Sequence, residues 1–227
     1  MKKMPKLMSP EELLRSEERM FILLCLIGGL LVLEPILRRF VAARIFLHIF
    51  LTAIFIYMVY IIRGKKRHII FNVLPAIVML VSIWLQYVYP NKGLLAIGMI
   101  AGVLFTGLVI ANFMASMFQS DEVTRAVIFM ALLSYLLAAL MWAFLYTFLE
   151  LVDPASFNID LSQPEGYLSE FKYYSFVTIT TLGYGDITPV TGVAKSFSVL
   201  EAVVGQLYVV VVIAWLVWNY VRQRRVS

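Results

Sequence analysis

The sequence predicts an all-α integral membrane protein with six transmembrane helices and a short re-entrant helix and loop between the fifth and the sixth. The 227 residues are 62% hydrophobic and only 15% charged, with a mean hydropathy of +0.88. Several stretches exceed the ~18 apolar residues that mark a candidate span. Between the last two stretches lies the region 151–194, which begins polar, becomes apolar and contains two glycines around a tyrosine.

The N-terminal segment 1–19 is polar, and we expect it to be a cytoplasmic amphipathic anchor at the membrane surface. Ser9 fits a helix cap, with Pro10 in the first turn and Glu12 at the capping-box position. A helix is therefore predicted from Pro10, continuing into the first span. The basic start is not followed by a short apolar core and a small-residue cleavage site, so we expect no cleavable signal peptide.

Six apolar segments follow, and each can cross a hydrocarbon core of about 30 Å as a helix, since ~20 residues rising 1.5 Å each are enough. The first four are expected to form a sensor-like domain over 20–118, followed by a cytoplasmic linker over 119–125. The six predicted spans are 20–37, 42–62, 69–89, 93–118, 126–150 and 195–221.

Basic clusters beside the spans predict which ends are cytoplasmic. The cluster within 63–67 and the tail 222–227 are both expected inside, and six spans then place the N-terminus inside as well. The loop between the fifth and sixth spans is then outside, and it is acidic. Its charged residues are Glu150, Asp153, Asp160, Glu165 and Glu170, against Lys172.

Three arginines around the junction of the first and second spans disagree with this orientation, because they would lie outside or near the outer interface. Long basic side chains can extend to an interface, and Glu34 can pair with one of them. A five-span alternative would instead leave the N-terminus outside. The three residues are Arg38, Arg39 and Arg44.

Charge and residue usage exclude several functions. The formal charge of +5 is explained by anchors beside the spans, so we expect no nucleic-acid partner. The single cysteine, Cys25, cannot form an intrachain disulfide. No suitably spaced set of His, Cys or carboxylate residues lies in any span, so the sequence predicts neither an enzyme nor an organic cofactor.

The most informative segment is 178–189, which reads Thr-Ile-Thr-Thr-Leu-Gly-Tyr-Gly-Asp-Ile-Thr-Pro. Gly183 and Gly185 can take left-handed backbone angles, so alternate residues can turn their carbonyls the same way. The product would be a column of backbone oxygens that replaces the water around a cation.

Residues 178–186 resemble the selectivity filter of tetrameric potassium channels, in the prokaryotic-type plan of six spans and one pore loop. The resemblance covers 126–221; the first four spans match only in number and topology. It implies a pore domain with outer helix 126–150, pore helix 168–180, filter 181–185 and inner helix 195–221. K⁺ would be the permeant ion, held by Thr181, Leu182, Gly183, Tyr184 and Gly185. Leu182 departs from the more common Val or Ile.

Several neighbours would support the filter in that family. The C-terminal end of the pore helix would point toward the cavity, where its dipole favours a cation. Thr178 begins the signature, while Tyr173 and Tyr174 could brace Tyr184 with their hydroxyls or pack at the interface. We expect Asp186 to accept a hydrogen bond from a pore-helix aromatic such as Tyr173; the alternative is a solvated loop carboxylate.

The inner helix carries candidate cavity and gate residues. Gly205 can be a hinge or a site of close helix packing. Glu201 is the only acid in this span, and it lies about 140° around the helix from Gln206. If Gln206 faces the cavity, Glu201 faces the pore helix or the fifth span and makes a structural or gating hydrogen bond. The proposed cavity-facing residues are Gln206, Val209, Ile213 and Val217.

The fourth span lacks the charges of a voltage sensor, which needs repeated Arg or Lys there. Residues 93–118 contain no charged residue, so strong voltage gating is not expected. His48 in the second span could sense pH, although a buried, hydrogen-bonded histidine is commoner. Four glycines suit close packing of the fourth span: Gly93, Gly98, Gly102 and Gly107.

Together these features predict one subunit of a homotetrameric, potassium-selective channel in the plasma (inner) membrane, with both termini cytoplasmic. One filter strand cannot enclose an ion, so four chains must assemble in the bilayer. We expect no soluble regulatory domain after residue 221. The alternatives are a weakly selective cation channel, a potassium transporter subunit, and a non-conducting sensor or adaptor. The opening stimulus stays open between lipid, tension, pH, a partner and constitutive leak.

Overall fold

The computed structural model describes residues 10–37, 41–61, 66–86, 88–120, 122–159 and 166–226. These residues form α-helices and connecting loops, with no strand in the described ranges. The helices are α1 (Pro10–Leu37), α2 (Val41–Ile61), α3 (Lys66–Leu85), α4 (Lys92–Phe118), α5 (Arg125–Val152), α6 (Tyr167–Ile179) and α7 (Gly192–Val226).

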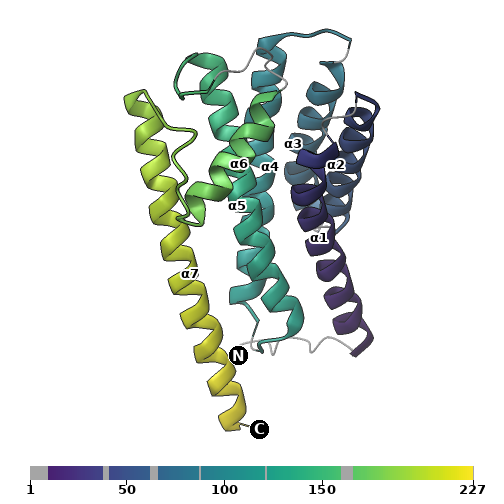
Figure 1. Cartoon of the computed structure of the whole chain (residues 1–227). Coiled ribbons are helices and arrows are strands. Elements are labelled where there is room, and N and C mark those ends of the chain that lie inside the picture. The colour runs from purple at the N-terminus through teal and green to yellow at the C-terminus, as the bar shows by residue number, and fades with distance from the viewer. Residues whose placement is uncertain are drawn as a thin grey trace.

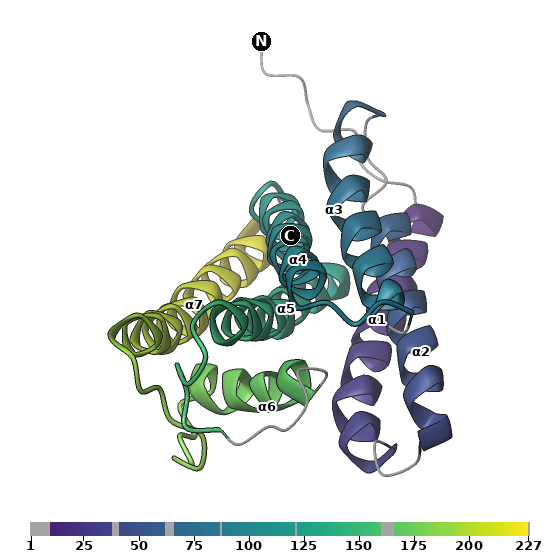
Figure 2. The ribbon, with the colours of Figure 1, turned by 90° about the horizontal axis from the view of Figure 1, so that it is seen from above.

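The helices form a layered bundle in which α1, α2 and α3 lie on one side and α7 on the other (Figure 1). Helices α4 and α5 occupy the middle and pack against each other, and α5 also contacts α1, α6 and α7. Viewed from above, the short helix α6 lies beside α5 and α7 (Figure 2). The largest apolar cluster contains residues from all of the first five helices, and a second one joins α5, α6 and the start of α7.

Most helix positions agree with the sequence prediction. The helix beginning at Pro10 continues through the first apolar segment as predicted; the proposed cap Ser9 lies outside the described residues. The short helix α6 occupies Tyr167–Ile179, one residue from the predicted range at each end. The basic clusters at 1–9 and 62–65, and Arg38 and Arg39, also fall outside the described residues.

The largest differences in helix boundaries lie at the ends of the third helix and of the last one. The third helix ends at Leu85 rather than at residue 89, because Val88 and Tyr89 donate to the Leu85 carbonyl and Pro90 follows. Asn91 then caps α4, and its side chain accepts from the amides of Gly93 and Leu94. The last helix begins at Gly192, three residues earlier than predicted, and extends to Val226.

Among the described residues, three helices are long and apolar enough to cross a membrane: Lys92–Phe118, Arg125–Val152 and Gly192–Arg224. Two further apolar helical stretches, Ile45–Ile61 and Val73–Leu85, are shorter.

Two of the glycines in α4 allow neighbouring helices to pack closely against it, as the sequence predicts. A Cβ at Gly98 would lie 2.8 Å from that of Ser82, and one at Gly102 would lie 2.9 Å from the Phe144 ring.

Candidate functional site

The backbone of the signature is held in an alternating conformation. Thr181, Gly183 and Gly185 all have positive φ angles, of 62°, 57° and 77°. Such angles are readily adopted by glycine and are costly for threonine, so the conformation of Thr181 must be imposed by its surroundings. The amides of Leu182 and Gly183 both donate to the Val177 carbonyl, at 2.9 and 3.2 Å. The end of α6 therefore fixes the start of the loop.

One side of this loop is not covered by the chain. The Leu182 residue is 56% exposed and Tyr184 is 66% exposed. A Cβ placed on Gly183 or Gly185 would meet no atom within 4 Å. The five signature residues 181–185 thus have a free face, although they lie between a helix too short to span a membrane and a long apolar helix.

The outer end of the loop is tied to α6 by the bond that the sequence predicts. The Tyr173 hydroxyl donates to Asp186 Oδ2 at 2.7 Å. The Tyr173 ring also stacks on that of Tyr184, with centroids 6.4 Å apart and planes inclined by 11°. The hydrogen bond from Tyr173 lowers the pKa of the Asp186 carboxyl. Asp186 therefore accepts the hydrogen bond expected of a brace, although its side chain is also exposed in the single chain.

Tyr174, the second tyrosine expected to brace Tyr184, has a different partner within the chain. Its hydroxyl points the other way and donates to Ser198 Oγ on α7 at 2.7 Å. Adjacent residues on a helix point about 100° apart, so both tyrosines cannot reach the same target in their own chain. Ser198 in turn donates to the Ala194 carbonyl at 2.8 Å. Within the chain, Tyr174 binds α6 to α7 instead of bracing the filter tyrosine.

Glu201 faces away from the exposed side of α7, as its helical position predicts. It is fully buried. The Tyr146 hydroxyl of α5 donates to Glu201 Oε2 at 2.6 Å, and Ser175 of α6 contacts Oε1. Ser175 also lies 2.7 Å from the Ala139 carbonyl. The carboxyl thus joins three helices at one point directly behind the signature, and its predicted orientation toward α5 and α6 is confirmed.

Gly205 lies against the end of α6. A Cβ at this position would fall 2.6 Å from both the carbonyl oxygen and Cγ1 of Ile179. The same carbonyl accepts a hydrogen bond from the Tyr135 hydroxyl at 2.9 Å. Close packing therefore accounts for Gly205, and its role as a hinge stays a prediction. The predicted cavity residues on the following turns, Gln206, Val209, Ile213 and Val217, are all exposed in the single chain.

The last turn of α5 carries a carboxyl that the sequence analysis counted among the charges of the acidic outer loop. Glu150 is buried, and its two oxygens accept from the amides of Ala155 and Phe157 at 2.8 and 3.1 Å. The Asn158 amide then donates to the Thr188 carbonyl at 2.8 Å. Glu150 thus shapes the loop that pairs with the segment after the signature, while Asp160 and Glu165 lie outside the described residues.

Sequence reasoning missed the hydroxyl partners of this region. Tyr146, Ser175 and Ser198 are polar groups in apolar helices, but such residues are common there and have no distinctive spacing. The available signal was Glu201, because a carboxyl within a span requires polar partners. In the described ranges, no group of three or more His, Cys, Asp or Glu residues could hold a metal ion.

Comparison with known proteins bears on this region directly. Residues 123–218 match the family model described as "Ion channel". This segment is similar to an ion-channel domain. It contains α5, α6, the signature and most of α7, and the match supports a place for the chain in the potassium channel superfamily. No curated protein and no solved structure was found to match.

Proposed function

We propose that the chain is one subunit of a homotetrameric potassium channel that conducts K⁺ passively through backbone-carbonyl sites. The observation that carries this proposal is the alternation of left-handed residues at Thr181, Gly183 and Gly185 within the ion-channel domain. Alternating angles allow the carbonyls from Thr181 to Tyr184 to face one axis, where they can replace the hydration shell of an ion. Neighbouring ions then move one another along by repulsion.

The exposure of the loop supports assembly into four copies. One strand offers oxygens from one side only, and in the single chain Tyr184 and the glycines have an open face. Four copies around an axis would close the ring of oxygens. The assembly would sit in the plasma membrane with α1 to α5 and α7 as the six spans, α6 as the re-entrant pore helix, and both termini in the cytoplasm.

Helix α7 would line the inner cavity in this arrangement. Gln206 supplies a polar group just below the filter, whereas the next turns are aliphatic. Crowding of these apolar side chains from four chains could close the path by dewetting. The aliphatic gate residues are Val209, Ile213 and Val217.

Helix α4 supports a channel without strong voltage gating. Its only charged residue is Lys92, at its first position. A voltage sensor needs several charges that cross the field, each contributing about 2.3 kcal/mol per 100 mV. We therefore expect the open probability to change little with voltage.

The proposal is tested by K⁺ flux from liposomes containing the purified protein. We expect barium-sensitive flux from the wild type and none from empty liposomes. Gly185→Ala should lose the flux because its φ of 77° disfavours a side chain. Gly107→Ala should keep it, because its Cβ would meet only the Met141 sulfur at an ordinary 3.6 Å. Absence of wild-type flux at every lipid composition, pH and voltage would favour a non-conducting sensor or adaptor.

A further inference from the structure

The pore helix α6 is held by four consecutive side chains that contact four different parts of the molecule. Successive residues of a helix point about 100° apart, so residues 172–175 together cover every side of one turn. Three of the contacts lie within the ion-channel domain, and the first reaches α1. The four pairs are Lys172 with Glu34, Tyr173 with Asp186, Tyr174 with Ser198, and Ser175 with Ala139.

The contact between Lys172 and Glu34 is a largely buried ion pair. The Lys172 ammonium donates to Glu34 Oε2, across 138 positions of sequence. The two side chains are 9% and 13% exposed. Lysine and glutamate are almost never buried unless they are paired. The pairing of Glu34 with a neighbouring arginine stays a prediction, because the side chains of those arginines lie outside the described residues; the pair with Lys172 joins α1 to α6.

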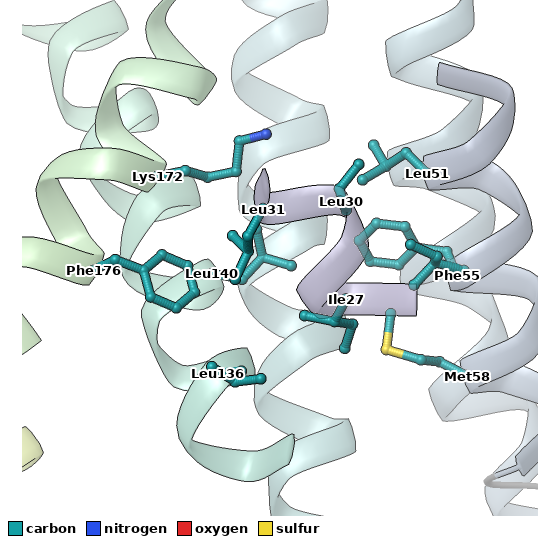
Figure 3. A pocket seen from close by; sticks show the side chains of 11 residues that line it. Ile27, Leu30, Leu31, Leu51, Phe55, Met58, Leu136, Leu140, Lys172 and Phe176 are labelled. Atoms are coloured by element: carbon teal, nitrogen blue, oxygen red, sulfur yellow. The ribbon is translucent and has the colours of Figure 1, made fainter. Parts of the chain in front are cut away.

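An apolar cavity lies beside this pair, between α1, α2, α5 and α6 (Figure 3). Lys172 extends from α6 toward α1, and its aliphatic stem is part of the cavity wall. The other lining side chains carry no charge, so little in the wall can stabilise a lone ion. Removing one member of the pair takes away a charge-assisted contact between α1 and α6 in a largely apolar site, which is unfavourable. The lining includes Ile27, Leu31, Phe55, Leu140 and Phe176.

We propose that the Lys172–Glu34 pair is a positioning contact through which the first helix sets the placement of the pore helix and, through it, the filter. The path is short. Tyr173, the next residue, binds Asp186 and stacks on Tyr184. Val177, one turn further, accepts the amides of Leu182 and Gly183.

A movement of α1 would therefore be transmitted through α6 to the filter. This coupling would need no gating charges on α4. This inference rests on the proposed channel function, but the mechanical part of it can be measured separately. Lys172 and Glu34 do not touch the ion path; they act through Tyr173 and Val177.

The test is a charge-exchange cycle in the full-length protein. The variants are Lys172→Met, Glu34→Gln and the exchanged pair Glu34→Lys with Lys172→Glu. Lys195→Met is the matched control, because Lys195 is an exposed lysine of the same domain. Two quantities are measured: the K⁺/Na⁺ permeability ratio in bilayers, and the amide hydrogen exchange of residues 173–186 in detergent.

We expect each single variant to lower the permeability ratio at least fivefold and to raise the exchange rate of 173–186 at least tenfold. The exchanged pair should restore both to within about twofold of the wild type, and Lys195→Met should change neither. If a single variant fails to assemble, the exchanged pair must recover assembly, permeability and exchange together.

Unchanged exchange in the single variants, or an exchanged pair no better than the single variants in assembly, exchange or permeability, would overturn the positioning role. Failure of the proposed function has a different signature: the wild type carries no K⁺ flux. In that case the exchange measurements still decide whether Lys172 and Glu34 position α6.

Discussion

Helices α5 and α7 are both apolar enough to span a membrane, yet their surroundings differ sharply. In the most apolar stretch of α5, 61% of the residues are buried inside the chain, whereas in that of α7 only 17% are buried. The neighbours of α5 are the helices of its own subunit, which contact it from several sides. Helix α7 meets its own subunit along one narrow face, so lipid or other copies of the chain must cover the rest.

The narrow face of α7 includes three polar or small residues. Ser198, Glu201 and Gly205 all contact α5 or α6, while the apolar residues on other faces are exposed. These positions are spaced by three and four residues, the spacing of one helix face. The difference between the two helices shows that a few specific contacts join α7 to the rest of its own chain, which is what the proposed assembly around the filter requires.

Glu201→Ala should have the largest effect, because it removes the carboxyl that joins α7 to α5 and α6. The Tyr146 hydroxyl would lose its partner in a buried site, and a cavity would remain. We expect a loss of about 2–4 kcal/mol per chain from these two causes. The measurement is the thermal midpoint of the tetramer in detergent. Glu201→Gln keeps two polar atoms and should lose less than half as much; equal losses would contradict the hydrogen-bonding role.

Gly205→Ala should follow, because the added methyl group would meet the Ile179 backbone at 2.6 Å. Overpacking of this kind costs about 1–3 kcal/mol. We expect reduced stability together with impaired K⁺ flux, since Ile179 lies two residues before the filter. Gly192→Ala is the control on the same helix, because its Cβ would meet nothing within 4 Å. Similar behaviour of the two variants would show that α7 does not press on α6.

Gly183→Ala isolates backbone strain from crowding. Its φ of 57° costs an alanine about 1–2 kcal/mol, although the space around it is open in one chain. We expect the subunit fold, followed by circular dichroism, to survive while K⁺ flux falls at least tenfold. Flux equal to that of the wild type would mean that the left-handed angle at Gly183 is not needed for conduction.

Tyr173→Phe should have the smallest effect, and a pH-dependent one. The hydrogen bond from Tyr173 lowers the Asp186 pKa, so the carboxylate persists below the ordinary value of about 3.9. Its stabilising contribution is present above that value and is lost as the pH falls through the lowered pKa. Without the phenol, we expect K⁺ current to fail at a higher external pH than in the wild type.

Tyr174→Phe is the matched control for this pH measurement, because its hydroxyl binds Ser198 and not Asp186. Its acid midpoint for the K⁺ current should equal that of the wild type. A midpoint in Tyr173→Phe that is unchanged or moved to lower pH would contradict the bond at the outer mouth.

Much of the ion-channel domain could be predicted because its information is local. The signature is continuous in sequence, the pore helix adjoins it, and helical geometry alone turned Glu201 toward α5 and α6. The bond between Tyr173 and Asp186 was predictable for the same reason, since only 13 positions separate the two residues.

The contacts that sequence reasoning missed or misassigned depend on how distant helices pack. Lys172 resembles a lone base in an acidic loop, and its partner Glu34 lies 138 positions away, so nothing in the local charge pattern reveals that they pair. In the sequence, Glu150 looks like one more charge of the acidic outer loop. The two amides that bind it belong to a loop without a recognisable motif, so its burial cannot be predicted. The side chain of Tyr174 is directed by the packing of α6 on α7, which no spacing in the sequence reveals.

The most direct test of a potassium-selective filter is the reversal potential of purified protein in a planar bilayer, with K⁺ on one side and Na⁺ on the other. We predict a reversal potential close to the K⁺ equilibrium value, with currents that depend weakly on voltage. A reversal potential near zero would identify a weakly selective cation pore. Steep voltage dependence would contradict the conclusion drawn from α4, whose only charged residue is Lys92 at its first position.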